Sequence, residues 1–141
     1  MIKNASAVWK GTIKEGGGVI STESGVLNEA QYGFKSRFES GKGTNPEELI
    51  GAAHAGCFSM ALSLMLGEAG FTPDRIETRA AVTIDKVGGG FEITSSHLDV
   101  VAEIPNIDQA KFDELANKAK EGCPVSKVLN AKITMNARLE A

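Results

Sequence analysis

Two cysteines are the residues in this sequence best suited to chemistry. Cys57 and Cys123 lie 123 − 57 = 66 positions apart. A free thiol is most often an inert core residue, and Cys57, in an apolar stretch, fits that role as well as a reactive one. Cys123 precedes Pro124 at the expected start of a short helix, where partial positive charge favours a thiolate. Local context alone would therefore make Cys123 the activated thiol.

A cation beside Cys57 would reverse that order, and Arg37 is the candidate, although a solvated surface arginine is the plain alternative. Of the two carboxylates at the start of the next helix, Glu47 lies about 80° from Cys57 around the helix axis and Glu48 nearly opposite. Glu47 is also about 15 Å from Cys57 along the same helix, too far for contact. Antiparallel packing of two copies would bring them together, which predicts an active site shared across a dimer.

His54 offers a second kind of chemistry. It precedes Cys57 by three positions, so the two could form a Cys-His dyad, although no Asn or Asp is evidently placed to orient the imidazole. Zinc ligation by Cys57, Cys123, His54 and His97 lacks a recognisable ligand spacing. The segment Gly41–Thr44 resembles the end of a phosphate-binding loop but lacks its glycine-rich start. We therefore expect neither a metal nor a nucleotide.

The elements that must position these residues follow from hydrophobic patterning. Strands are expected at 6–13, 19–22 and 32–39; in the last, Tyr32, Phe34 and Phe38 would share one face and Arg37 the other. Asn45 and Pro46 predict the start of a long helix that ends near Gly67–Gly70. The later elements are a hairpin of strands at 75–86 and 91–104, a helix capped by Asp108 that ends at Gly122, a short helical turn after Cys123, and a strand at 131–139.

The long helix is apolar on all sides between Leu49 and Leu66, long enough to raise the question of a membrane span. We interpret it as the buried helix of a soluble protein, because Ala, Gly and Ser are weakly hydrophobic and His54 lies in its middle. Small residues recur every four positions and predict close approach of another helix: Gly51, Ala55, Ser59 and Ser63. The rest of the chain can cover about half of this helix, so a homodimer is expected.

Composition limits the other possibilities. The chain has 141 residues, 42% hydrophobic and 23% charged, with a net charge of −3. One folded domain over residues 1–141 is expected, with no electrostatic footprint for nucleic acid or an anionic membrane. Residues 1–6 open no apolar signal-peptide core, so the cytoplasm is the expected location.

With these residues in view, the sequence resembles the OsmC family of osmotically inducible and organic hydroperoxide resistance proteins. The combination of an Asn-Pro-Glu helix start, a Cys-Phe-Ser segment and a later Gly-Cys-Pro is specific. The matching segments extend over most of the chain: Ser21–Leu27, Gly33–Phe34, Arg37–Glu39, Gly43–Ala61 and Gly122–Ser126.

The resemblance implies an α+β fold, an intertwined homodimer whose antiparallel-type sheets wrap two long central helices. It also implies a peroxidase that reduces organic hydroperoxides, and hydrogen peroxide more weakly, without a cofactor. Cys57 matches the peroxidatic cysteine and Cys123 the resolving one, joined as a disulfide that an external thiol reduces. Arg37 matches the arginine that stabilises the thiolate, and Glu47 the carboxylate that holds it.

Two alternatives stay open at this point. One is a Cys-His hydrolase or acyl transferase that uses Cys57 and His54. The other is a dimer without enzymatic activity that binds a small ligand.

For the peroxidase, an apolar pocket lining that includes Phe58 and Met60 would favour alkyl hydroperoxides.

Overall fold

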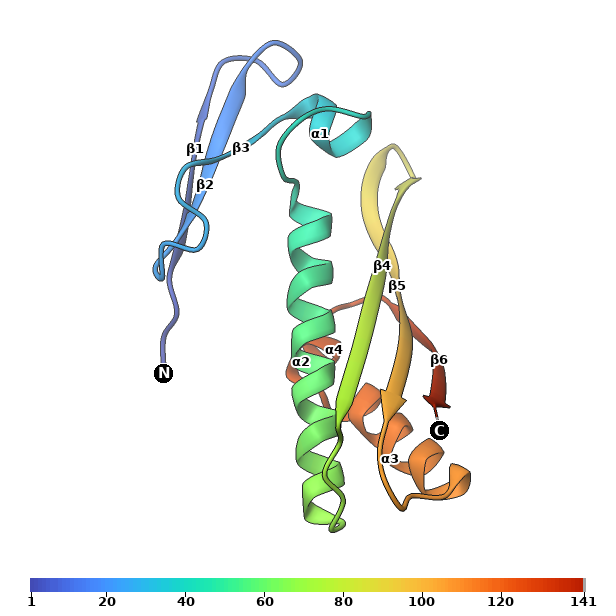
Figure 1. Cartoon of the computed structure of the whole chain (residues 1–141). Coiled ribbons are helices and arrows are strands. Elements are labelled where there is room, and N and C mark those ends of the chain that lie inside the picture. Colours follow the sequence, from blue (N-terminus) through green and yellow to red (C-terminus); the bar gives the residue numbers. More distant parts are fainter. Residues whose placement is uncertain (141) are drawn as a thin grey trace. The chain divides into compact units, whose positions relative to one another are not determined.

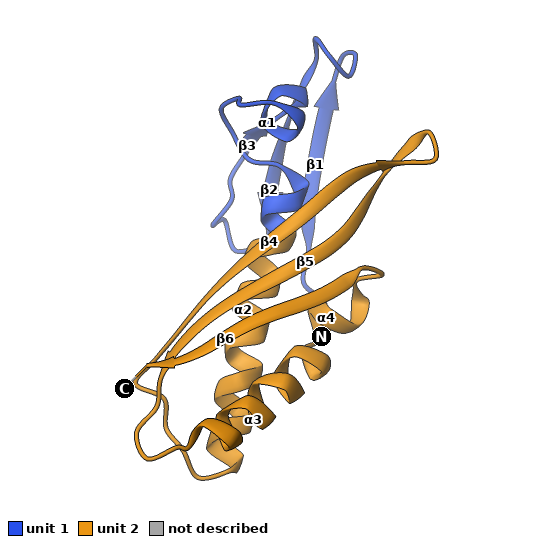
Figure 2. Ribbon diagram, turned by 90° about the vertical axis from the view of Figure 1, so that its right-hand side faces the viewer, with its two compact units in different colours: residues 1–49 blue, residues 50–141 orange. Residues whose placement is uncertain are grey.

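The computed structural model describes residues 1–140. They form two compact units, one made of residues 1–49 and one that begins at residue 50 (Figure 2). The division falls inside the long helix α2, Pro46–Glu68, whose first residues belong to the first unit. The expected single domain over residues 1–141 stays a prediction.

The first unit is built on a small antiparallel sheet in the order β1-β2-β3. Its elements are β1 (Ala5–Lys10), β2 (Gly17–Thr22), β3 (Ala30–Tyr32) and the short helix α1 (Phe34–Phe38). Two of the three predicted strands are confirmed with shifted ends.

The strand predicted at 32–39 is wrong, because the chain turns into α1 after Tyr32. The backbone N–H of Gly33 donates to Ser36 Oγ at 2.9 Å, and that hydroxyl donates to the Gly33 carbonyl at 3.0 Å. The rings of Phe34 and Phe38 lie 5.2 Å apart, which is a contact between positions i and i+4 of a helix. The same spacing reads as alternation in a strand, so the pattern was compatible with both structures.

The second unit places α2 and α3 on one face of a three-stranded sheet in the order β4-β5-β6 (Figures 1 and 2). Its elements after α2 are β4 (Arg75–Val87), β5 (Gly90–Glu103), α3 (Gln109–Gly122), α4 (Pro124–Val128) and β6 (Lys132–Glu140). The β4–β5 hairpin is antiparallel as predicted, whereas β6 pairs parallel with β5. The α+β class is confirmed, and the antiparallel description fails at this one pair, because α3 and α4 carry the chain back before β6 begins.

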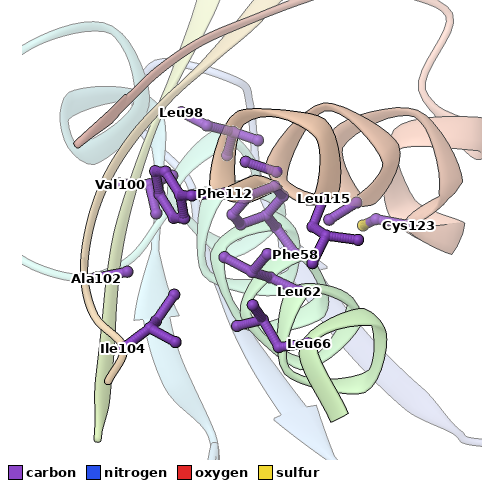
Figure 3. Close-up of a cluster of buried hydrophobic side chains, with 12 residues drawn as sticks. Phe58, Leu62, Leu66, Leu98, Val100, Ala102, Ile104, Phe112, Leu115 and Cys123 are labelled. Atoms are coloured by element: carbon purple, nitrogen blue, oxygen red, sulfur yellow. The ribbon is translucent and has the colours of Figure 1, made fainter. Parts of the chain in front are cut away.

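The core of the second unit lies between α2, β5 and α3. Phe58, Leu62 and Leu66 of α2 are completely buried and face α3 (Figure 3). The remaining members come from β5 and α3 with their flanking residues: Leu98, Val100, Ala102, Ile104, Phe112, Leu115, Ala116, Ala119 and Cys123. Cys123 therefore ends a helix that the core holds in place.

The row of small residues on α2 has a different neighbour from the one predicted. A Cβ on Gly51 would lie 3.3 Å from the carbonyl oxygen of Ala80 in β4. Ser59 Oγ lies 2.7 Å from Thr78 Oγ1, also in β4. The small residues thus allow β4, rather than another helix, to approach α2.

The opposite face of α2 is open. Met60 is 76% exposed and Leu64 62% exposed. By length and composition α2 could cross a membrane, but the core helix of a soluble protein passes the same test. Its buried row of Phe58, Leu62 and Leu66 packs as the core helix of a soluble unit does. The described chain covers only part of α2, as predicted.

Candidate active site

The thiols of Cys57 and Cys123 lie close enough in the second unit for Cys123 to shift the pKa of Cys57. Cys57 lies in the middle of α2 and is half-buried, whereas Cys123 is completely buried between α3 and α4. Folding has brought together two thiols from distant parts of the sequence. Because both are free and interact, the pair is a candidate for oxidation to a disulfide.

The backbone amide of Val125, at the start of α4, lies near the Cys57 sulfur and favours its thiolate. Cys123 occupies the N-cap position of α4, but its side chain makes no capping hydrogen bond. The prediction from local context, that the start of α4 favours a Cys123 thiolate, stays a prediction; the amide of Val125 acts on the other thiol. A sequence cannot show this, because it depends on where α4 lies against α2.

The pKa of the Cys57 thiol is raised above its usual value, mainly because burial disfavours the thiolate. The Cys123 thiol raises this pKa further, and the Val125 amide lowers it. No cation is among the groups of the described chain that shift it. A reactive Cys57 thus needs a positive charge from elsewhere.

His54 is completely buried and uses both ring nitrogens within the second unit. Its Nδ1 lies 2.7 Å from Ser96 Oγ in β5, and its Nε2 lies 2.7 Å from Ser126 Oγ in α4. Burial lowers the pKa of the imidazole. With both nitrogens held by serines, His54 is not arranged as the base of a dyad with Cys57. Neither serine was predicted as a partner of His54, although Ser96 lies in the buried row of β5, where a polar residue needs a hydrogen-bond partner.

Arg37 and Glu47 form an ion pair in the first unit. The Arg37 Nε donates to Glu47 Oε1 at 2.8 Å. The Glu47 side chain is 8% exposed and that of Arg37 36% exposed. Among the described residues, Glu47 Oε2 is buried without a hydrogen-bond donor. The predicted contact between Arg37 and Glu47 is therefore present as an ion pair. The second carboxylate oxygen, Glu47 Oε2, can still accept a hydrogen bond from another donor.

Asn45 joins the two helices that carry this ion pair. Its Oδ1 accepts the N–H of Glu48 at 2.8 Å and so caps α2, as predicted. Its Nδ2 donates to the carbonyl of Ser36 in α1 at 2.9 Å. The cap of one helix thus fixes the position of the other, and with it the distance from Arg37 to Glu47.

Arg37 also borders an apolar cavity of about 280 Å³ in the first unit. Its guanidinium carbon lies 5.3 Å from the centre of the Phe38 ring. The other lining residues are Trp9, Ile13, Tyr32, Gly33 and Phe34. The predicted substrate lining stays a prediction: Phe58 is part of the core of the second unit, and Met60 is exposed.

His97, the other possible zinc ligand, lies on β5 with Thr134 and Asp99 as neighbours. Within residues 1–140, no three His, Cys, Asp or Glu side chains gather as metal ligands would.

The family described as OsmC-like protein matches residues 39–138, which include both cysteines and Glu47. This chain belongs to the OsmC family. It is 60% identical to the peroxiredoxin OsmC of Escherichia coli K12 over 139 residues, 99% of this chain and 97% of that one. It is 32% identical to the organic hydroperoxide resistance protein OhrB of Bacillus subtilis 168, over 87% of this chain and 89% of that one. The predicted family is confirmed.

Solved structures agree on the fold. An OsmC-like protein of unknown function from Vibrio cholerae O1 biovar eltor superposes with a TM-score of 0.77 at 12% sequence identity, covering 97% of this chain and 99% of that one. At this identity the likeness shows the fold alone. The fold of the described chain is thus that of OsmC-like proteins.

Proposed function

We propose that this OsmC family member is a thiol-dependent peroxidase that reduces organic hydroperoxides, with Cys57 as the peroxidatic and Cys123 as the resolving cysteine. The enzyme class agrees with that of the Escherichia coli relative, a peroxiredoxin, and the substrate class with the organic hydroperoxide resistance proteins. The observation that carries the two roles is the contact between the thiols, with the Val125 amide directed at Cys57.

The chemistry needs only these thiols and an outside reductant. The Cys57 thiolate attacks the distal oxygen of the hydroperoxide and the O–O bond breaks. Cys57 becomes a sulfenic acid, and the alkoxide takes up the proton that the thiol had released and leaves as the alcohol. The Cys123 sulfur then bonds to the Cys57 sulfur, and the sulfenic oxygen leaves as water with the Cys123 proton. An external thiol reduces the disulfide and restores both cysteines.

The ion pair of Arg37 with Glu47 supplies the charge that Cys57 lacks within the described chain. In this proposal Arg37 stabilises the thiolate and Glu47 holds Arg37 in place. The cavity beside Arg37, lined by aromatic side chains, suits the alkyl or aryl group of an organic hydroperoxide. Hydrogen peroxide would not fill it and is the weaker substrate.

A homodimer completes the site. Glu47 and Cys57 are ten residues apart on one continuous helix, about 15 Å, so they do not meet within one chain. A second copy packed on the open face of α2 would cover Met60 and Leu64 and bring Arg37 and Glu47 of one chain to Cys57 of the other. The unpartnered Glu47 Oε2 supports this arrangement, since a buried carboxylate oxygen without a donor is costly.

The proposed location is the cytoplasm, where small and protein thiols keep disulfides reduced. Both units would act together as one OsmC-like domain over residues 1–141. The two alternatives lose support: His54 is occupied by serines, and a ligand carrier has no need for two thiols in contact.

The test compares Cys57→Ser and Cys123→Ser with the unsubstituted chain, using cumene hydroperoxide and a dithiol reductant. Cys57→Ser should abolish peroxide consumption. Cys123→Ser, mixed with peroxide before the dithiol is added, should consume one equivalent and hold a sulfenic acid on Cys57. Intact mass should show one Cys57–Cys123 disulfide per chain in the oxidised protein. Consumption by Cys57→Ser at the original rate would exclude the proposed function.

A further inference from the structure

The buried His54 links three elements of the second unit by two short hydrogen bonds. It stands on α2, one turn before Cys57, and contacts β5 through Ser96 and α4 through Ser126, each at 2.7 Å. His54 and Ser96 are completely buried, so the bond between them is shielded from water, whereas Ser126 is half-buried. The neutral imidazole has one donor and one acceptor nitrogen, so one serine accepts a hydrogen bond and the other donates one. Every polar atom of the ring is thereby satisfied.

The element held by Ser126 carries the groups that act on Cys57. α4 has five residues, begins directly after Cys123 and contains Val125, whose amide reaches the Cys57 sulfur. A helix this short has little stability of its own. Ser126 is the next residue after Val125, so the bond to His54 restrains α4 beside the amide and the resolving thiol.

We propose that His54 is a positioning residue for the resolving half of the reaction: through Ser126, and anchored by Ser96, it holds α4 so that the Cys123 thiol meets the oxidised Cys57. This inference rests on the proposed roles of the two cysteines. His54 transfers no proton to substrate and touches no reacting atom. Its effect is on how quickly the Cys57 sulfenic acid is captured.

The consequence is a choice between two fates for that sulfenic acid. Capture by Cys123 forms the disulfide and releases water. A second hydroperoxide instead oxidises the sulfenic acid to a sulfinic acid, which external thiols do not reduce, and releases a second alcohol. Loosening α4 slows capture and therefore increases the yield of the irreversible product at high peroxide.

The test is Ser126→Ala, which removes only the α4 end of the link and leaves His54 bonded to Ser96. Rapid mixing with cumene hydroperoxide, followed by dimedone trapping and intact mass, measures the sulfenic acid and the disulfide separately. Loss of one hydrogen bond should slow disulfide formation roughly threefold to tenfold. The trapped sulfenic acid and the sulfinic acid should rise in the same proportion.

Two further variants separate positioning from general loss of stability. Ser59→Ala removes a hydrogen bond of the same length, to Thr78, from the same helix, but it does not involve α4. It should leave the rate of disulfide formation unchanged. Ser126→Thr keeps the hydroxyl and should restore the original rate.

The measured rates of disulfide formation decide whether His54 positions α4. Disulfide formation in Ser126→Ala at the original rate, with no more dimedone adduct, would overturn the role of His54 while leaving the peroxidase intact. Equal slowing by Ser59→Ala would overturn it as well, since the effect would then be one of stability. Absence of any Cys57–Cys123 disulfide in the unsubstituted protein would instead overturn the proposed function.

Discussion

At Cys57, several groups act on one sulfur atom in opposite directions. Burial and the Cys123 thiol raise its pKa, and the Val125 amide lowers it. The amide belongs to α4, which begins directly after Cys123, so the helix next to one cysteine favours the thiolate of the other. Reactivity at this position thus depends on groups far away in sequence, and in our proposal on Arg37 as well.

His54 should make stability depend on pH. Burial lowers its pKa in the folded chain, whereas the unfolded chain binds the proton near the usual value of about 6.5. Below that pH the unfolded state holds more protons, so the free energy of unfolding falls on acidification, by up to about 1.4 kcal/mol per pH unit until the folded pKa is reached. At higher pH this contribution is fully present.

Urea unfolding between pH 7.5 and pH 5.5 checks this expectation. His54→Gln keeps hydrogen-bonding groups but does not titrate, so its stability should change less over that interval than that of the unsubstituted chain. Parallel curves for the two proteins would mean that His54 titrates alike in the folded and unfolded states.

Part of this site could be predicted from the sequence. The two cysteines, Arg37 and Glu47 were all candidates. Arg37 meets Glu47 in the first unit, and Cys57 meets Cys123 in the second. Ser96, Ser126 and the Val125 amide were missed. Their partners come from other elements, and nothing local marks a serine or an amide as the neighbour of a particular histidine or cysteine.

At the scale of elements, the turn between α1 and α2 sets the geometry of the ion pair. Gly43 has a φ of +104°, and a Cβ there would lie 2.2 Å from the carbonyl oxygen of Gln31. That same carbonyl accepts the N–H of Thr44 at 2.8 Å. Only glycine fits this approach, and the turn delivers Asn45 to its place at the start of α2.

Gly43→Ala should therefore lower the free energy of unfolding by about 1–3 kcal/mol and reduce peroxidase activity by displacing Glu47. Gly17→Ala is the matched control. Its Cβ would meet nothing within 4 Å, and its backbone is not in the left-handed region, so we expect a change within about 0.5 kcal/mol. Denaturant unfolding of both variants measures the difference; equal stabilities would contradict the steric argument.

Sequence patterns predicted some helix boundaries correctly and failed for one segment and for one strand direction. Asn45 and Asp108 mark the starts of α2 and α3 by local chemistry, and both were predicted correctly. The segment at 34–38 was ambiguous because Phe34 and Phe38 satisfy both a strand and a helix. The parallel direction of β6 follows from α3 and α4, since a connection of that length can return the chain to the same end of the sheet.

At the scale of the whole molecule, the open face of α2 matters most. Met60 and Leu64 are large apolar side chains on the central helix, and the described chain leaves both exposed. A second copy is the proposed cover, and it also supplies the charge for Cys57.

Mixed dimers test whether the site is shared. We expect each homodimer of Cys57→Ser and of Glu47→Ala to be inactive or strongly impaired. When one chain of each kind is combined, one site draws an intact Cys57 from one chain and an intact Glu47 from the other. Co-expression with two affinity tags, followed by a peroxide assay, should recover about half of the activity per dimer. If both residues came from the same chain, mixing would recover nothing beyond the average of the parents.

The contact between Cys57 and Cys123 has a consequence for the choice of reductant. A disulfide that closes a loop of this length opposes unfolding by about 4 kcal/mol, chiefly by restricting the unfolded chain. Thermodynamic linkage works in both directions, so the fold stabilises the disulfide by the same amount. That free energy corresponds to a midpoint potential about 90 mV more negative than in the unfolded chain. A strongly reducing dithiol, whose own oxidation closes a ring, is therefore better suited to regenerate this enzyme than a simple monothiol.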